Sequence, residues 1–309
     1  MLRLENIEKS FGEKKALQGI DLSIEQGEIF GLIGQEDAGK TTLFRIIAGL
    51  LKPDKGSVWL RGERIQDKPR RAKLEVGYVP STFRLYDKLK VREYMEFYAG
   101  FYPLEGLKKD RWISEILDQM NLLKMENVYV EKLSQGMSRR LCMAQALLSD
   151  PQVLILDETG NGLDSRARQE FREILKKLSL SNRTILISSH NVSELPDYCT
   201  SVGILQDGKM LMQGNVAQMV GEIKKRQPVL IQIVAGQDLA IDMLKENERV
   251  KRITVLDTGA LISFDGTEED EAELLTSLVR AGVGVCGFSR GNENFERSIM
   301  NIISGQGES

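Results

Sequence analysis

The chain has 309 residues, too many for one average domain and about right for two. Hydrophobic residues make up 41% and charged residues 28%, an ordinary globular composition with enough apolar side chains for real cores. The net charge of -3 gives no electrostatic indication of nucleic-acid binding. No apolar run approaches the roughly 20 residues of a membrane helix, so work at a membrane would need another chain to span it.

The cysteines and the N-terminus bear on the cellular compartment. Cys142, Cys199 and Cys286 are far apart and lie in apolar surroundings. We expect them to be reduced core residues of a cytosolic protein, and not disulfides or metal ligands. The first six residues already alternate like a strand, so we expect no signal peptide there.

Residues 1–33 are predicted to form strands, because apolar and polar residues alternate in two separate stretches. The apolar stretch 27–33 leads into residues 34–42, which read Gly-Gln-Glu-Asp-Ala-Gly-Lys-Thr-Thr. Helical apolar spacing follows in residues 43–48. A strand, a loop with Gly-x-x-x-x-Gly-Lys-Thr and a helix in this order predict a phosphate-binding loop.

The predicted loop suits a nucleotide. Its backbone N–H groups and the dipole of the following helix favour an anion. We expect Lys40 to reach the β- and γ-phosphates of ATP and the Thr41 hydroxyl to bind Mg²⁺. The nucleotide-binding residues predicted in this loop are Gly34, Gln35, Glu36, Asp37, Ala38, Gly39, Lys40, Thr41 and Thr42.

The segments that follow predict an α/β core. Short strands with many basic residues are expected over 57–80, and the pattern turns helical from 91 to about 148. Fully apolar runs at 153–156 and 184–187 are typical of buried parallel strands, with a helical stretch at 165–178 between them. This order predicts a doubly wound nucleotide-binding core with a helical insertion.

The apolar run at 153–156 ends in two carboxylates, Asp157 and Glu158. Such a pair suits ATP hydrolysis, because Asp157 can hold the Mg²⁺ shell and Glu158 can polarise the attacking water. The alternative is an ordinary buried strand with an acidic end. The phosphate-binding loop upstream favours the catalytic interpretation.

Residues 133–137 read Leu-Ser-Gln-Gly-Met, just before a helix expected from about 138 to 148. The Ser134 hydroxyl and the helix N-terminal amides would make a second anion site. His190 is the only histidine and directly follows the apolar run at 184–187. A lone histidine is usually structural, but its place after this strand favours contact with the γ-phosphate.

The sequence changes character after residue 221. We predict a nucleotide-binding domain over 1–221, with its helical subdomain at about 85–150, a linker at 222–228 and an α+β domain at 229–309. The last domain has the β-α-β-β-α-β order of a ferredoxin-like fold, with Thr267 capping its second helix. A final helix over about 293–303 has an apolar stripe, which favours a dimer-stabilising role.

These motifs in this order resemble the ATP-binding subunit of an ABC (ATP-binding cassette) transporter. The resemblance covers residues 1 to about 221, and it rests on the phosphate-binding loop, the signature at 133–137, the Asp157–Glu158 strand, the D-loop at 162–164 and His190. It implies a P-loop NTPase cassette with an antiparallel β subdomain and a helical subdomain. It also implies that Phe11 stacks on adenine. The C-terminal domain resembles the extension of bacterial drug, lipid and polysaccharide exporters.

The resemblance further implies a head-to-tail dimer of cassettes, with itself or with a different cassette. ATP and Mg²⁺ would lie between the phosphate-binding loop of one cassette and the signature of the other. The residues acting in trans would be Ser134, Gln135, Gly136 and Met137, with the D-loop Asp164 nearby. Closure around ATP would drive a separate transmembrane permease, and hydrolysis by Glu158 would reopen the dimer. We expect a cytoplasmic exporter subunit held at the inner membrane face by its permease, with no nucleic-acid partner.

Three places depart from the family pattern. Asp37 stands where the family usually has glycine; aspartate tolerates the left-handed conformation, but its charge and that of Glu36 are expected to weaken ATP binding. Ser81 stands at the Q-loop position, where the usual glutamine touches Mg²⁺ and water, and it could act only through a bridging water. Thr159 and Gly160 replace Pro and Thr before the D-loop.

Two interpretations of these departures stay open. Either the site hydrolyses ATP slowly, or it is a degenerate site that lends its signature to an intact partner cassette. Glu158 and His190 favour a working ATPase. A soluble ABC ATPase acting on ribosomes or DNA is a further alternative, against which the single cassette and mild acidity argue.

One predicted helix is unusually aromatic. Its rings fall at helical spacing at Tyr94, Phe97, Tyr98, Phe101 and Tyr102. We expect most of them in the core of the helical subdomain. One or two are expected to face the groove that, by resemblance, receives a coupling helix of the permease.

Overall fold

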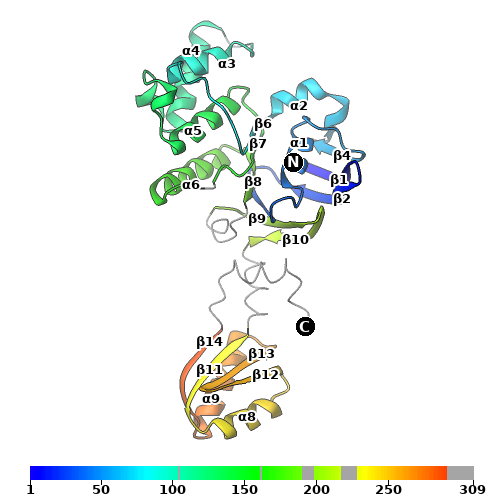
Figure 1. Cartoon of the computed structure of the whole chain (residues 1–309), viewed down its shortest axis with the longest axis vertical. Coiled ribbons are helices and arrows are strands. Elements are labelled where there is room, and N and C mark those ends of the chain that lie inside the picture. Colours follow the sequence, from blue (N-terminus) through cyan, green and yellow to red (C-terminus); the bar gives the residue numbers. More distant parts are fainter. Residues whose placement is uncertain (104, 161, 190–197, 217–227, 291–309) are drawn as a thin grey trace. The chain divides into compact units, whose positions relative to one another are not determined.

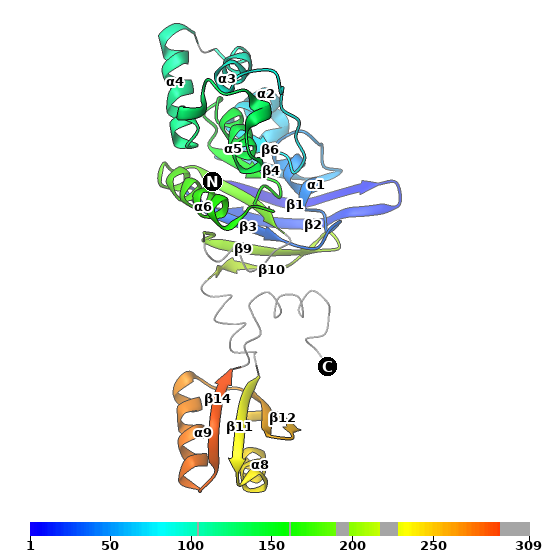
Figure 2. The same cartoon turned by 60° about the vertical axis from the view of Figure 1, so that its left-hand side comes forward.

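The computed structural model describes residues 1–103, 105–160, 162–189, 198–216 and 228–290. The chain divides into two compact units, Met1–Asn215 and Val216–Ser309 (Figures 1 and 2). His190, most of the predicted linker and the predicted final helix lie outside the described residues.

An antiparallel sheet with strand order β2-β1-β4-β5 begins the first unit. Its strands are β1 (Leu2–Phe11), β2 (Lys14–Ile24), β4 (Lys55–Leu60) and β5 (Glu63–Arg64). Leu2 pairs with Ile24 and Leu4 with Leu22, and all four side chains are buried. The predicted alternation over residues 1–33 is therefore confirmed for β1 and β2.

A six-stranded sheet with order β10-β9-β3-β8-β7-β6 forms the centre of this unit. Its strands are β3 (Ile29–Ile33), β6 (Val76–Val79), β7 (Val153–Leu156), β8 (Thr184–Ser189), β9 (Ser201–Gln206) and β10 (Lys209–Asn215). All neighbours are parallel except β10, which is antiparallel to β9. The carboxyl ends of β3, β8, β7 and β6 therefore meet at one edge, where open α/β sheets bind ligands.

The helices of the first unit are α1 (Lys40–Ile47), α2 (Pro69–Glu75), α3 (Val91–Ala99), α4 (Gly106–Gln119), α5 (Gln135–Ala146) and α6 (Ser165–Leu180), with short 3₁₀ helices η1 (Ile65–Asp67), η2 (Leu123–Met125) and η3 (Val130–Lys132). Helices α3, α4 and α5 form a group of their own (Figure 1). Helix α2 corrects the expectation of strands alone over 57–80. Its sequence begins with proline and continues with helix formers, a signal that the basic composition obscured.

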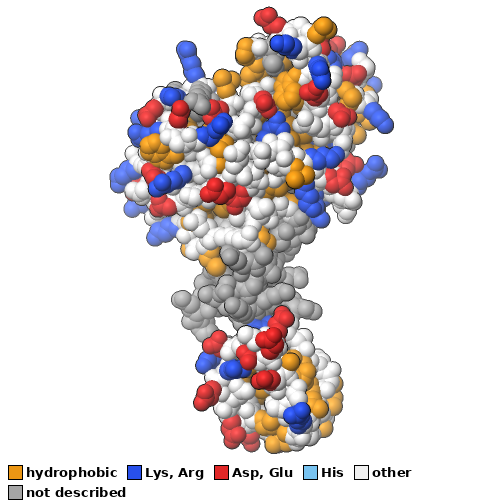
Figure 3. Space-filling view, turned by 180° about the vertical axis from the view of Figure 1, so that it is seen from behind, with side chains coloured by type: hydrophobic (Ala, Val, Ile, Leu, Met, Phe, Trp, Pro, Cys, Tyr) orange, Lys and Arg blue, Asp and Glu red, His pale blue; other side chains and the backbone are white. Residues whose placement is uncertain are grey.

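Helix α1 joins the two sheets through one core. Leu43, Phe44, Ile46 and Ile47 are buried in the same cluster as residues of β1, β2, β3 and β4. The loop before α1 is thus anchored at both ends, by β3 and by α1. Over the face of this unit drawn in Figure 3, acidic and basic side chains are interspersed.

The second unit has its own core and sheet. Its elements are β11 (Val229–Ala235), α8 (Gln237–Glu246), β12 (Val250–Leu256), β13 (Gly259–Phe264), α9 (Glu268–Arg280) and β14 (Gly284–Arg290). The antiparallel sheet has the order β12-β13-β11-β14. The predicted cap is confirmed, because the Thr267 hydroxyl accepts from the Asp270 N–H at the start of α9.

The cysteine prediction is wrong at one position. Cys142 and Cys199 are buried, but Cys286 is exposed. Cys286 lies on β14, an edge strand, so its apolar neighbours in sequence do not enclose it. Burial raises the pKa of the Cys142 thiol to about 12, which keeps it protonated and unreactive.

Candidate nucleotide-binding site

The loop between β3 and α1 needs glycine at two points. A Cβ on Gly34 would lie 2.4 Å from the Leu205 carbonyl oxygen, and a Cβ on Gly39 would lie 2.5 Å from that of Ala16. Gly39 also has a φ of 108°, outside the range of other residues. The loop therefore packs tightly against the adjoining backbone. This packing fixes the positions of its amide groups.

Lys40, the first residue of α1, is 4% exposed. Its Nζ donates to the carbonyl oxygens of Gly34 and Gln35, each at 2.8 Å, and lies 3.8 Å from Glu158 Oε1. Burial lowers the pKa of this ammonium, while the Glu158 carboxylate opposes the shift. The amine is held over the loop, where phosphate oxygens could replace the two carbonyls as acceptors.

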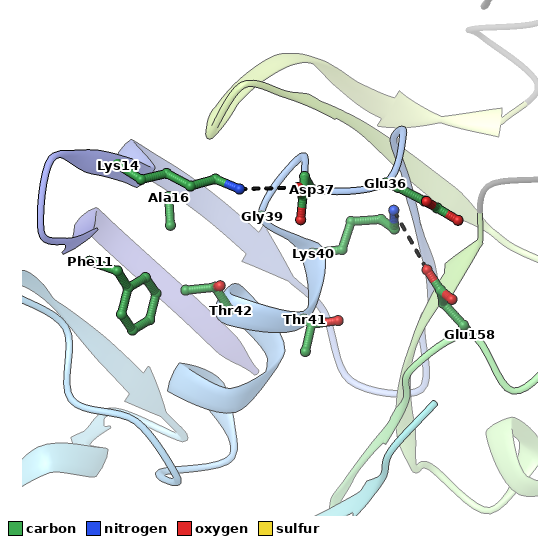
Figure 4. Close-up of a pocket in the computed structure, with 10 residues that line it drawn as sticks. All are labelled: Phe11, Lys14, Ala16, Glu36, Asp37, Gly39, Lys40, Thr41, Thr42 and Glu158. Atoms are coloured by element: carbon green, nitrogen blue, oxygen red, sulfur yellow. Dashed lines mark ion pairs between the residues drawn. The ribbon is translucent and has the colours of Figure 1, made fainter. Parts of the chain in front are cut away.

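A pocket of about 480 Å³ lies beside this loop (Figure 4). Its lining consists of Phe11, Lys14, Ala16, Glu36, Asp37, Gly39, Lys40, Thr41, Thr42 and Glu158. Phe11 ends β1 and is 51% exposed, with Lys9 Nζ 5.6 Å from its ring centroid, so part of the ring is accessible to a flat ligand. The predicted loop, the predicted adenine-stacking ring and the predicted catalytic carboxylate are thus brought together.

Asp37 adopts the left-handed conformation, with a φ of 65°. Its side chain is 87% exposed, and Oδ2 lies 3.1 Å from Nζ of Lys14 on β2 (Figure 4). The negative charge that the sequence places in this loop is therefore largely exposed to solvent, and its cationic partner also lines the pocket. Lys14 was not among the predicted site residues, because nothing local links it to the loop 23 positions later.

Asp157 is fully buried at the end of β7 and accepts two hydroxyl hydrogen bonds. Ser188 Oγ donates to Oδ1 at 2.7 Å, and Tyr78 Oη donates to Oδ2 at 3.1 Å. Ser188 Oγ also accepts from the Glu158 N–H at 2.9 Å. Sequence reasoning missed Tyr78 and Ser188, because only the neighbouring positions of β6, β7 and β8 bring them to Asp157.

Glu158 has a φ of 53°, a rare conformation for a residue with a side chain. Such strain persists where the surroundings hold it and often marks a functional turn. Here the turn follows β7 directly, and the carboxylate reaches the pocket with 30% of its side chain exposed. Glu158 therefore faces the pocket while Asp157 stays buried.

The signature residues lie elsewhere in the unit. Ser134 caps α5, its Oγ accepting from the Met137 N–H at 3.3 Å, and the helix begins at Gln135, earlier than predicted. Gly136 packs near Ala167 of α6, and a Cβ on Gly136 would lie 3.2 Å from the Ala167 Cβ. Within one chain, the described pocket lining includes none of the residues 134–137.

Two further predicted residues, Asp164 and Ser81, lie outside the lining of the pocket. Asp164 caps α6, its Oδ1 accepting from the Ala167 N–H at 2.8 Å. Ser81 follows β6 and is exposed, and among the described residues no hydrogen bond joins its side chain to the pocket. His190 lies outside the described residues, so its contact with the γ-phosphate stays a prediction.

The side chains at the pocket suit Mg²⁺ brought with a nucleotide. Asp157 is a buried carboxylate held by hydroxyl donors, and Thr41 lines the pocket. Among the residues described, no cluster of three or more His, Cys, Asp or Glu could hold a metal. Mg²⁺ usually takes one or two protein ligands and completes its shell with phosphates and water, which fits this sparse set.

Fold and site together define a P-loop nucleotide-binding protein. The sequence profile of the ABC transporter family matches residues 17–161. The uncharacterized ABC transporter ATP-binding protein YhaQ of Bacillus subtilis (strain 168) is 35% identical over 306 residues, covering 98% of this chain and 97% of YhaQ. The Nod factor export ATP-binding protein I of Burkholderia lata is 34% identical over 209 residues, 68% of this chain and 69% of that protein.

A solved structure shares the fold. The dimeric ATP-binding cassette MJ0796, in a post-hydrolysis state with ADP and Pi, has a TM-score of 0.63 at 26% identity, covering 70% of this chain and 99% of that one. The chain belongs to the ATP-binding proteins of ABC transporters. In the part of the chain that the structure describes, no helix is both long and apolar enough to cross a bilayer.

Proposed function

We propose that this chain binds ATP with Mg²⁺ and hydrolyses it to power a membrane transporter. The observation that carries the proposal is the convergence of Lys40, Thr41 and Glu158 on one pocket, from α1 and from the end of β7. Lys40 would neutralise phosphate charge, and Glu158 would orient the attacking water. Thr41 and Asp157 would hold Mg²⁺, which neutralises charge on the phosphates when bound.

A second cassette would complete the site. The signature residues, with Ser134 at the start of α5, are outside the pocket of their own chain. The related MJ0796 cassette is dimeric. Both observations support a head-to-tail pair in which the signature acts in trans, and in which closure around ATP does the mechanical work. The predicted roles of Asp164 and His190 belong to this proposal.

An exposed aromatic patch supports a separate membrane partner. Tyr86, Phe97 and Phe101 are 54%, 48% and 72% exposed, and their rings contact one another in edge-on pairs around Phe97. Tyr94, by contrast, is 1% exposed. Exposed aromatic groups of this kind mark interaction sites, and we assign this one to the permease. The chain would then sit at the cytoplasmic face of the membrane.

Export is the proposed direction of transport, because the relative from Burkholderia lata is named for Nod factor export. The match to YhaQ spans 98% of this chain, so it includes the second unit. We assign that unit, residues 229–309 after a linker at 222–228, to the ferredoxin-like class on its strand order, and propose an accessory role in dimerisation. The interspersed charges on the face of the first unit drawn in Figure 3, with the net charge of -3, favour a transporter subunit over a nucleic-acid-bound ATPase.

Mg-ATP turnover by the purified chain tests the proposal. The wild type and Glu158→Gln are compared over a wide range of protein concentrations. We expect turnover that rises more than linearly with protein and that is lost in Glu158→Gln. Binding of ATP without turnover, unchanged after addition of the permease, would contradict the ATPase assignment.

A degenerate partner subunit is the second candidate, favoured by Ser81 at the Q-loop position and by Asp37 in the phosphate-binding loop. If it holds, Ser81→Gln combined with Asp37→Gly should raise turnover sharply. The solvent exposure of Asp37 and its pairing with Lys14 weigh against it. No gain in the double variant would reject it.

A further inference from the structure

We propose that Tyr78 is a positioning residue for the metal-holding carboxylate, and that its hydroxyl sets the orientation of Asp157 toward Mg²⁺. This inference rests on the proposed function. Tyr78 lies on β6, next to β7 in the parallel sheet, and its Oη donates to Asp157 Oδ2 at 3.1 Å. Asp157 itself has no exposed surface.

The two hydroxyl donors reach the carboxylate from opposite neighbouring strands. Tyr78 comes from β6 and Ser188 from β8, on either side of β7. Each oxygen of Asp157 accepts one of these hydrogen bonds, which fixes a terminal torsion that is otherwise soft. A carboxylate offers about four lone-pair positions, so two remain for a metal-bound water or the metal.

Two hydrogen bonds join the end of β6 to Asp157. The Asp157 carboxylate can only accept, so the hydrogen of the Tyr78 hydroxyl is directed toward Asp157 Oδ2. The Asp157 N–H also donates to the Val79 carbonyl oxygen at 2.9 Å, which ties the same two strands at the next residue. The Tyr78 hydroxyl thus lies near both Arg45 of α1 and the Asp157 carboxylate.

The Tyr78 hydroxyl donates to a carboxylate that has no exposed surface, so water does not compete for this hydrogen bond. Groups that hold metal ligands in place typically change metal affinity by about tenfold or more when they are removed.

The test uses the full chain with ADP and Mn²⁺ as the probe, free Mn²⁺ being measured by electron paramagnetic resonance. We expect Tyr78→Phe to weaken ADP-dependent Mn²⁺ binding about tenfold, with ADP affinity in EDTA unchanged. Tyr129→Phe, on an exposed ring away from the pocket, is the matched control. In an Asp157→Asn background, Tyr78→Phe should have no further effect, since the hydroxyl acts through that carboxylate.

Each outcome is decisive. Mn²⁺ affinity within about twofold of wild type in a folded Tyr78→Phe chain overturns the inference. It is also overturned if Tyr78→Phe lowers Mn²⁺ affinity by the same factor in the Asp157→Asn chain as in the wild type. Should Tyr78→Phe fail to fold, Arg45→Met replaces it, because Arg45 lies near the Tyr78 hydroxyl and the variant keeps the ring; about threefold weaker binding is expected. A wild-type chain that binds no ADP would instead reject the proposed function.

Discussion

Asp37 keeps the left-handed backbone that this position of the loop requires, and its carboxylate is largely exposed and paired with Lys14. We therefore expect solvent and Lys14 to moderate the repulsion between Asp37 and ATP. Both side chains are largely exposed, at 60% for Lys14 and 87% for Asp37, so solvent screens the pair strongly. Its effect on binding should be real but small.

Removal of Lys14 tests this compensation. Lys14→Ala should weaken ATP binding about threefold at low salt, and less at high salt, because an exposed pair contributes up to about 1 kcal/mol. The measurement is a titration with ATP at two ionic strengths. Lys55→Ala, which breaks the exposed Lys55–Glu8 pair outside the pocket lining, is the control and should change nothing. If Lys14→Ala lowers ATP affinity by the same factor when Asp37→Gly is also present, Lys14 does not act through Asp37 and the expected compensation is contradicted.

Lys40 predicts a pH dependence of ATP binding. Burial lowers the pKa of its ammonium below the ordinary 10.5, and bound phosphates would raise it again. ATP affinity should therefore fall as the pH rises through the lowered pKa, and binding should take up a proton there. Without nucleotide, the free energy of unfolding changes with pH in the opposite direction. Between the lowered pKa and 10.5 the unfolded chain binds more protons than the folded chain, so stability rises with pH.

Calorimetry in two buffers of different ionisation enthalpy, at about pH 9, measures this proton uptake. Lys40→Arg, whose charge does not titrate in this range, is the matched variant and should bind without linked protons. Uptake of equal size in both chains would show that another group is responsible.

At the scale of elements, α5 is joined to the rest of the unit by two consecutive arginines. Arg139 Nη1 donates to the Thr159 carbonyl oxygen at 2.8 Å, next to Glu158. Arg140 Nη1 lies 3.0 Å from Glu170 Oε2 of α6. The helix that begins with the signature is thus tied both to the catalytic turn and to the helix after the D-loop. A movement of α5 would therefore displace both the turn at Glu158 and helix α6.

Arg140 and Arg166 provide a matched pair of substitutions, because both contact Glu170. The Arg140 side chain is 10% exposed and that of Arg166 is 90% exposed. Arg140→Met should lower the free energy of unfolding by about 2 kcal/mol, since it removes the buried partner of Glu170 and leaves that half-buried carboxylate only the exposed Arg166. Arg166→Met should cost less than about 0.5 kcal/mol. Urea unfolding checks both, and similar effects would refute the argument.

At the scale of the molecule, each of the two units has its own hydrophobic core. The cluster around α1 contains residues of the first unit only, and the cluster around Ile231 and Leu278 contains residues of the second only. All residues that line the nucleotide pocket belong to the first unit. Domains with their own cores can usually fold alone.

Expression of residues 1–215 alone should therefore give a folded chain. We expect its ATP affinity to lie within about twofold of the full chain, because no described pocket residue is removed. Thermal unfolding and an ATP titration measure the two properties. Aggregation, or a loss of affinity beyond about tenfold, would mean that the second unit supports the first.

The sequence alone determined the features that depend on neighbours along the chain. The phosphate-binding loop, the strand before Asp157 and Glu158, the cap at Thr267 and the element order of the second unit all follow from spacing and residue type. Such signals are local, because they reflect backbone conformation and the burial of one face. Where local composition was ambiguous, as at α2, the prediction was wrong.

Only the tertiary structure decided which distant groups meet. Lys14 pairs with Asp37 across two elements, and Tyr78 and Ser188 reach Asp157 from strands 79 and 31 positions away in sequence. The exposure of Cys286 likewise depends on β14 lying at an edge. Strand order is set by packing of the whole sheet, and no local pattern encodes it. Spacing along the sequence therefore predicted the principal residues of the site, but it could not predict Lys14, Tyr78 and Ser188, which contact them.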